Sequence, residues 1–498
     1  MAGRMGWTGK FCWLASRAAA MALALSLAGC LGLSGEDGGL SADQLAAANA
    51  VPQGKVDPNE VAIAEREHPK IVAAFGGTYE DREAELAIAS VVGRLVAASP
   101  EPWRSYRVTI LNSPAVNAFA LPGGYVYVTR GLLALASDTA EVAAVISHEM
   151  AHVTARHAFL RAQKAEAAAV ASQAVQDVVQ DPAVQRVALA STQVSLARFS
   201  QIQELEADRI GIATLAKAGF DPFASPRFLT SMSRLAAWKN GLPEDDTGSI
   251  DFLSSHPSTP ERLAQAQEVA KATGVTDGEV DHDGYLSRID GIMYGDDPNE
   301  GYVRGRQFLH AKLGFAFEVP EGFLIDNTSK AVLATNADGV AMRFDGANIA
   351  AGSDLVAYLT SGWVNGLDQQ SVRTVSIAGL PAAVASASAR GFTYRIAVIR
   401  FADQAFRFLF ATRGDAAALD QTFSSTVASF RSLSEAEKAS LAPLRIRVVT
   451  VGASDTTDTL TRRMVPMDRG VVLFRALNGL AANEEPRAGT RVKIIVDR

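Results

Sequence analysis

The stretch His148-Glu149-Met150-Ala151-His152 fits the pattern H-E-x-x-H and lies in a segment that reads as a helix. A helix turns about 100° per residue, so residues four apart lie about 40° apart on one face. His148 and His152 can therefore aim two imidazoles at one point. Two neutral imidazoles at this spacing suit Zn²⁺, and Glu149 can reach a water there without binding the metal itself. The pattern predicts the site of a zinc hydrolase with Glu149 as catalytic base.

This pattern is specific. With 7 His and 54 acidic residues among 498, about 0.01 matches are expected by chance. The alternative is a helix with a few solvated polar residues. The flanking residues argue against it, because polar groups on a largely apolar helix need partners, which a metal supplies. These apolar neighbours are Val142, Ala143, Val145, Ile146, Met150 and Val153.

A third ligand is expected from a later helix, and Glu204-Leu205-Glu206-Ala207-Asp208 offers it. Glu204 and Asp208 are four apart and share one face, whereas Glu206 should point elsewhere. We therefore expect Glu204 to bind the metal and Asp208 to accept the other imidazole N–H of a ligating histidine, which fixes its tautomer. Without the upstream motif, these acids would be interpreted as ordinary solvated helix residues.

His157 invites comparison with the longer metzincin pattern, which needs Gly and His at positions held here by Ala155 and Ala158. On one continuous helix, His157 would lie about 180° from His148. We therefore expect His157 to point away from the metal, at the surface or behind the ligands, and we expect no metzincin.

Several further motifs complete a resemblance to a known family. They are Asn117-Ala118-Phe119-Ala120-Leu121-Pro122-Gly123-Gly124, the strand after it, Gly131-Leu132-Leu133, Arg156-His157 and Glu204 to Gly211. Together with the H-E-x-x-H motif, residues from about Val61 to Ala266 resemble the HtpX and CAAX-protease-like zinc metallopeptidases, which are gluzincins, and within them the soluble periplasmic branch. The resemblance implies one Zn²⁺ per chain, held by His148, His152 and Glu204.

The resemblance also places Ser255-His256-Pro257 near the active site. A lone His in a loop is more often a surface residue. Two functional roles are open for His256. It can donate a hydrogen bond to the oxyanion of the tetrahedral intermediate as a catalytic residue, or it can bind the open position of the zinc and hold the enzyme latent.

The N-terminus reads as a lipoprotein signal peptide over residues 1–29, with a basic region and a short apolar run that ends in Leu27-Ala28-Gly29-Cys30. This resembles a lipobox, so Cys30 is expected to carry lipid; an ordinary secretory cleavage is the alternative. Leu31 follows in place of Asp, which by resemblance favours the inner leaflet of the outer membrane. The protein would then lie in the periplasm on a lipid anchor.

We expect an α+β protein with a mainly helical zincin-type domain, a small sheet, an antiparallel-sheet domain and a small βααβ module. The expected parts are a signal peptide (1–29), a tether (30–58), the metallopeptidase domain (59–275), a linker or lid (276–306), an α+β recognition domain (307–435) and a module resembling LysM (443–498). LysM modules bind peptidoglycan sugars; glycan binding is an open question here, because the compact Gly-Asp-Thr of that module is replaced.

The strand Tyr125 to Thr129 is expected at the sheet edge above the metal, where an extended substrate can pair with it. Recognition through backbone hydrogen bonds depends little on sequence, so we expect unfolded or misfolded envelope polypeptides as substrates. A net charge of −7 gives no support for nucleic-acid binding. Two rivals remain: a non-proteolytic outer-membrane assembly or peptidoglycan-associated scaffold whose zinc is structural, and a peptidoglycan hydrolase.

Overall fold

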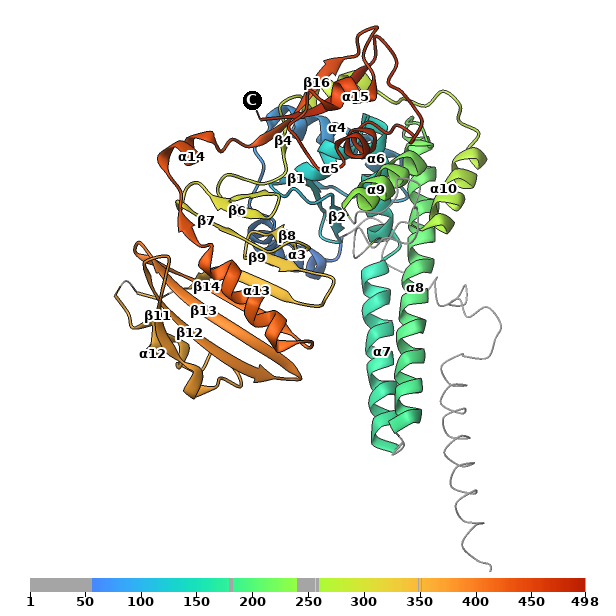
Figure 1. Cartoon of the computed structure of the whole chain (residues 1–498). Coiled ribbons are helices and arrows are strands. Elements are labelled where there is room, and N and C mark those ends of the chain that lie inside the picture. Colours follow the sequence, from blue (N-terminus) through green and yellow to red (C-terminus); the bar gives the residue numbers. More distant parts are fainter. Residues whose placement is uncertain are drawn as a thin grey trace, which may run out of the picture.

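The computed structural model describes residues 56–178, 182–239, 256, 259–347, 349–350 and 352–497. The predicted signal peptide, the lipidation site Cys30 and nearly all of the predicted tether lie outside these residues. In the described part, a mainly helical body carries a separate domain of antiparallel strands to one side, and a long helical hairpin projects from the body (Figure 1).

The body begins with two helices in the region where the sequence has a helical pattern, α3 (Pro58–Ala74) and α4 (Arg82–Ala98). The side chains of Asp57 and Asp81 cap their first turns by accepting backbone N–H groups. A three-stranded sheet follows, made of β1 (Arg107–Leu111), β2 (Ala118–Leu121) and β3 (Tyr125–Thr129).

The order of this sheet corrects one prediction. The order is β1-β3-β2, with β1 parallel and β2 antiparallel to β3. The strand Tyr125–Thr129, which we expected at the edge, is therefore central, and β2 is the edge strand beside the metal helix. The reason is long-range: β1 returns to the far side of β3, and no pattern within the strand reveals that neighbour.

The metal helix α6 (Thr139–Thr154) follows the short helix α5 (Arg130–Leu135). Asp138 caps it, since its carboxylate accepts the N–H of Glu141 at 2.8 Å. The carboxylate of Glu141 accepts the N–H of Ser137 at 2.8 Å, one residue before the cap. Ala143, Ile146 and Met150 lie in the core, which fixes the rotation of the helix.

A helical hairpin follows the metal helix. It consists of α7 (His157–Val178) and α8 (Pro182–Lys217), the helix that carries Glu204, and its far end projects from the body (Figure 1). Gly211 on α8 faces His148, and a Cβ there would lie 3.0 Å from the backbone nitrogen of His148. The missing side chain therefore lets α8 approach α6 closely at the level of the motif. Helices α9 (Ala224–Lys239) and α10 (Pro260–Ala272) complete this region.

The segment 276–306, expected as a linker or lid, is folded. It forms α11 (His282–Ile289) and β4 (Met293–Tyr294), which belong to the body, and β5 (Tyr302–Arg304), which joins the small sheet of the next domain. Strand β4 pairs with β16 of the C-terminal unit in a sheet of order β17-β16-β4. That unit consists of β16 (Leu444–Thr450), α15 (Thr457–Thr461), α16 (Gly470–Leu477) and β17 (Arg491–Val496).

The C-terminal unit shares one hydrophobic core with the metal helix. Ile446, Phe474 and Ile494 belong to the same buried cluster as Ile146 and Met150. The order β16-α15-α16-β17 is that of a βααβ unit, and the likeness to LysM stays a prediction.

The antiparallel domain lies between these two parts of the body in the chain. Its seven-stranded sheet has the order β11-β12-β13-β14-β10-β9-β8, and a smaller sheet has the order β15-β7-β6-β5. Its elements are β6 (Gln307–His310), β7 (Phe315–Glu318), β8 (Leu324–Asn327), β9 (Val332–Thr335), β10 (Ala341–Ala347), α12 (Leu355–Leu359), β11 (Arg373–Ile377), β12 (Leu380–Ala389), β13 (Phe392–Phe401), β14 (Gln404–Thr412), α13 (Ala416–Ala428), β15 (Arg431–Ser432) and α14 (Glu435–Ser440). Strands β13 and β14 form a hairpin around Asp403.

The two ends of this domain meet. The guanidinium of Arg304 donates to the carbonyl oxygen of Ala442 at 3.3 Å. A buried phenylalanine cluster, which includes Phe315, Phe344 and Phe408, forms a core separate from that of the body. Among the described residues, every helix is too short or too polar to cross a membrane.

Candidate metal centre

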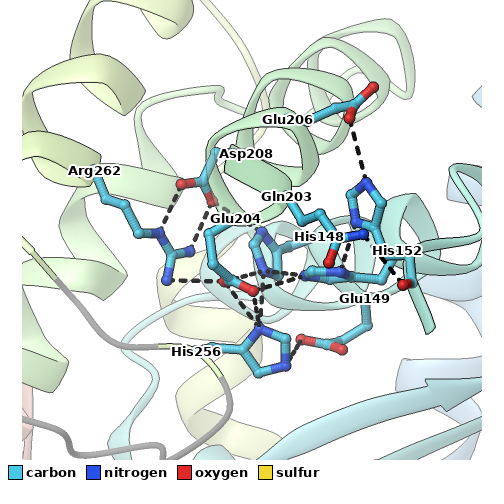
Figure 2. A network of polar contacts seen from close by, with 10 residues as sticks. His148, Glu149, His152, Gln203, Glu204, Glu206, Asp208, His256 and Arg262 are labelled. Atoms are coloured by element: carbon cyan, nitrogen blue, oxygen red, sulfur yellow. Dashed lines mark hydrogen bonds and ion pairs between the residues drawn. The ribbon is translucent and has the colours of Figure 1, made fainter. Parts of the chain in front are cut away.

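Four side chains from two helices and one loop residue converge on one point (Figure 2). His148 and His152 come from α6, Glu204 comes from α8, and His256 lies beyond α9. One donor atom from each lies within 4.8 Å of all the others. The structure thus brings together the three predicted ligands and the histidine whose role the sequence left open.

The distances between the donor atoms fit a tetrahedral ion. Nε2 of His148 lies 3.1 Å from Nε2 of His152 and 3.3 Å from Oε2 of Glu204. Oε1 of Glu204 lies 3.4 Å from Nε2 of His152. Nδ1 of His256 lies 2.9 Å from Oε2 of Glu204 and 3.5 Å from Nε2 of His148. A tetrahedron with metal–ligand bonds of about 2.0–2.1 Å has edges of about 3.3–3.4 Å, so these nitrogen and carboxylate donors fit Zn²⁺.

The outer nitrogen of His148 meets Asp208, the carboxylate expected to accept the N–H of one of the ligating histidines. Oδ1 of Asp208 lies 2.8 Å from Nδ1 of His148. Burial alone would lower the pKa of His148, but Asp208 and Glu204 outweigh it and raise this pKa to about 10. The centre therefore strongly favours positive charge at this point, as a cation-binding site requires.

Arg262 holds two of the acidic residues of α8, Glu204 and Asp208. Its Nε and Nη2 donate to the two oxygens of Asp208 at 2.8 and 2.9 Å, and its Nη1 lies 3.2 Å from Oε2 of Glu204. Burial raises the pKa of the Asp208 carboxyl, but Arg262 and His148 together hold it below its usual range. The sequence alone assigns no role to Arg262, because only the folded chain shows that α10 packs beside α8.

His157 lies behind a predicted ligand, which is one of the two positions expected for it. Its ring is buried, with 1% exposed, and its Nδ1 lies 2.8 Å from Nδ1 of His152. The expected 180° separation assumed one continuous helix. Instead α6 ends at Thr154, and Arg156 adopts the left-handed region with φ 52°. This break turns the chain so that His157 faces a predicted ligand. Glu206 does point away from the centre, as expected, and its carboxylate lies 3.4 Å from Nε2 of His157.

Glu149 lies beside the donors and outside the set of four. Its side chain is buried, and its Oε1 lies 3.7 Å from Nε2 of His256. Burial raises the pKa of Glu149, while His256 and His148 act in the opposite direction. A buried carboxylate with a raised pKa, beside the donor atoms, suits a residue that takes and returns a proton.

A mostly apolar pocket opens beside His148 and Glu149. Four elements contribute its apolar walls, and His256 and Arg262 border it. The apolar lining residues are Ala118 from β2, Leu132 from α5, Ala144 and Val145 from α6, and Phe228, Leu229 and Met232 from α9. The pocket is small, about 40 Å³, and it places an apolar surface close to the reacting groups.

A helix that carries H-E-x-x-H, joined by a glutamate from a later helix, defines the gluzincin class of metallopeptidases. Residues 82–270 match the model of Peptidase family M48, and this segment contains all four donors and Glu149. The match and the relatives' names support a metal-dependent protease.

Relatives extend this likeness over part of the chain. The mitochondrial metalloendopeptidase OMA1 of Arabidopsis thaliana is 36% identical over 171 residues, which cover 34% of this chain and 33% of that protein. The putative β-barrel assembly-enhancing protease of Vibrio cholerae is 31% identical over 187 residues, covering 36% and 37%. The β-barrel assembly-enhancing protease of Escherichia coli is 28% identical over 256 residues, covering 48% and 51%. The chain thus spans between a third and about half of the length of these relatives.

Proposed function

We propose that the chain is a zinc-dependent endopeptidase of the bacterial envelope, which hydrolyses peptide bonds of misfolded or unassembled envelope proteins. The observation that carries the proposal is the convergence of His148, His152 and Glu204, with donor separations of 3.1 to 3.4 Å. Glu149 lies beside these donors and does not join them. A site built only for structure has no need of such a buried carboxylate.

The three donors would hold one Zn²⁺, which when bound lowers the pKa of water from about 15.7 toward ~7 and polarises a carbonyl. The residues of the chain supply the proton transfers. Glu149 takes a proton from the attacking water and delivers it to the nitrogen of the leaving amine. Asp208, held by Arg262, fixes the orientation of His148.

The substrate is proposed to bind as an added strand along β2. This strand is the edge of its sheet, and Ala118 at its start lines the same pocket as His148 and Glu149. Backbone pairing reads no particular sequence, whereas the apolar pocket selects one exposed apolar side chain. Unfolded polypeptides present both features, and the names of the Vibrio cholerae and Escherichia coli relatives favour envelope proteins as substrates.

His256 occupies the place that would complete the donor set, so we propose that it keeps the enzyme latent until substrate displaces it. Its Nδ1 lies 2.9 Å from Glu204 and 3.5 Å from His148, which suits a fourth ligand. The competing role, donation to the oxyanion, predicts the opposite effect of removing this ring on activity.

The location is a proposal from the sequence. A lipid on Cys30 would hold the protein at the periplasmic face of the outer membrane, and globomycin treatment should then cause the precursor to accumulate. Contact of the C-terminal unit with peptidoglycan is a further proposal, and a sacculus pull-down with the purified protein tests it. A sacculus-release assay separates it from hydrolysis of peptidoglycan.

The deciding experiment is metal analysis of the mature protein combined with a casein-cleavage assay. We expect about one zinc per chain, loss of cleavage after treatment with a chelator, and recovery on addition of zinc. The Glu149→Gln protein should retain the metal and lose cleavage. A metal-loaded protein that cleaves no unfolded substrate, even with His256 replaced by Ala, would overturn the proposal.

One observation favours a second candidate. With His256, the cluster offers four protein donors, and a site closed by four protein ligands is typical of structural zinc. The chain would then act as a non-proteolytic scaffold in envelope assembly. Complementation distinguishes the two: full rescue of a deletion strain by Glu149→Gln means that binding, and not cleavage, is the function.

A further inference from the structure

The two histidines of the motif have different partners on their outer nitrogens. Nδ1 of His148 lies 2.8 Å from the carboxylate of Asp208. Nδ1 of His152 lies 2.8 Å from Nδ1 of His157, and the two rings meet edge to face with centroids 4.8 Å apart. One outer partner is therefore an anion and the other an imidazole.

The backbone at this point is arranged to bring His157 back to the site. Arg156 has φ 52°, a conformation that costs a residue with a side chain about 1–2 kcal/mol. The adjacent helix secures the result, since the side-chain amide of Gln203 donates to the carbonyl oxygen of His157 at 3.1 Å. A strained turn beside a predicted ligand indicates that the resulting contact has a function.

The position of the proton on His152 determines which of the two rings donates the hydrogen bond between them. Nε2 of His152 faces His148 and Glu204, so it must lack a proton if it is to bind a metal. The proton of the neutral ring is then on Nδ1, which donates to Nδ1 of His157. His157 in turn carries its proton on Nε2, 3.4 Å from the carboxylate of Glu206. Each partner has one donor and one acceptor in the right place.

We propose that His157 is a positioning residue, which holds His152 in the tautomer and orientation that expose Nε2 to the metal, and that Glu206 fixes His157 in its turn. The inference rests on the proposed metal-dependent function. Removing a residue that holds a metal-ligating histidine in this way commonly lowers metal affinity by about 10- to 100-fold. Glu206 is partly exposed, so its own contribution should be smaller.

The test measures zinc affinity of the full chain by competition with a chelating dye, together with thermal unfolding of the metal-free protein. His157→Leu removes the acceptor, whereas His157→Asn keeps an acceptor near the position of Nδ1. We expect His157→Leu to weaken zinc binding by about 10- to 100-fold, His157→Asn to recover most of the loss, and Glu206→Gln to lose less than His157→Leu. His310→Leu, which removes a buried histidine in the other domain, serves as the matched control and should bind zinc like the wild type.

Equal zinc affinity of His157→Leu, His157→Asn and the wild type overturns the inference. An equal loss of zinc affinity in His157→Leu and His157→Asn also overturns the inference, because the loss would then come from altered packing and not from the missing acceptor. Zinc binding and casein cleavage by the wild-type protein distinguish a failure of this inference from a failure of the proposed function. If the wild type binds zinc tightly but cleaves no casein, the function fails and the positioning role stands. If it binds zinc and cleaves while the His157 variants bind zinc normally, only the positioning role fails.

Discussion

Nζ of Lys493 lies 2.6 Å from the carbonyl oxygen of Ala136, the residue that ends helix α5 two places before the cap of the metal helix. The same ammonium donates to the carbonyls of Ala134 and Leu135 at 2.9 and 2.8 Å. Burial lowers the pKa of Lys493 to about 7, although Glu141 and Asp138 act in the opposite direction. Strand β17 is thereby attached where the chain passes from α5 to α6.

Replacing Lys493 by Met should destabilise the whole body. Three buried carbonyls at the end of α5 lose their donor, and each unsatisfied group costs about 1–3 kcal/mol, so a loss of about 3 kcal/mol or more is expected. Urea unfolding measures it. Arg447→Met on the neighbouring strand, which removes a partly exposed ion pair with Asp290, is the control and should cost less than about 1 kcal/mol. Separate unfolding of the C-terminal unit and the metal helix would contradict the shared core.

Glu149→Gln should abolish catalysis without displacing the metal. The amide cannot take a proton from water, so kcat should fall by about 10²- to 10⁴-fold while zinc affinity stays within a few-fold of that of the wild type. A casein or quenched-peptide assay with metal analysis of the same sample checks both quantities. Substantial turnover by this variant would remove Glu149 from the role of base.

His256→Ala should raise basal peptidase activity. If the ring occupies the fourth position in about nine of ten molecules, its removal increases the competent fraction about tenfold. Initial rates of cleavage of a short peptide by the wild type and by His256→Ala measure this gain. A small loss of zinc affinity should accompany it. A large fall in kcat would instead assign His256 to the oxyanion.

Acid should destabilise the antiparallel domain through His310. This side chain is 7% exposed, and burial, with help from Lys312, lowers its pKa from about 6.5 to about 4. Between these values the unfolded chain binds a proton that the folded chain does not, so stability falls as the pH drops from 6.5 to 4, by up to about 3 kcal/mol.

His310→Asn keeps an acceptor near Nδ1 but does not titrate in this range. The variant should therefore lose about 2–3 kcal/mol less than the wild type between pH 7 and 4.5, as measured by urea unfolding followed through a probe in this domain. Parallel curves for the two proteins would show that His310 does not cause the acid sensitivity.

The sequence predicted those parts of the centre that depend on local geometry. His148 and His152 share a face because they are four residues apart on one helix, and the same rule aligned Glu204 with Asp208 and turned Glu206 away. It left open whether His157 lies at the surface or behind the ligands, because a left-handed residue breaks the helix that the rule assumes. A periodic pattern contains no signal for one such residue.

Long-range relationships could not be predicted in this way. Three contacts join segments that are distant in the chain: the pairing of β1 with β3, the hydrogen bonds of Arg262 to Asp208, and the hydrogen bond of Lys493 to Ala136. Local patterns agree with individual elements: the strands on either side of the turn at Pro122 and the hairpin at Asp403 lie where alternating residues and turn residues favour them. Their partners depend on packing, which the sequence pattern does not report.

The hydrogen bond between Arg304 and Ala442 joins the two ends of the antiparallel domain, which lies between two parts of the helical body in the chain. Because the entry and exit of this domain lie together, the domain can be replaced without interrupting the body. A chimera with a foreign insert of the same end-to-end spacing should therefore still assemble the metal centre.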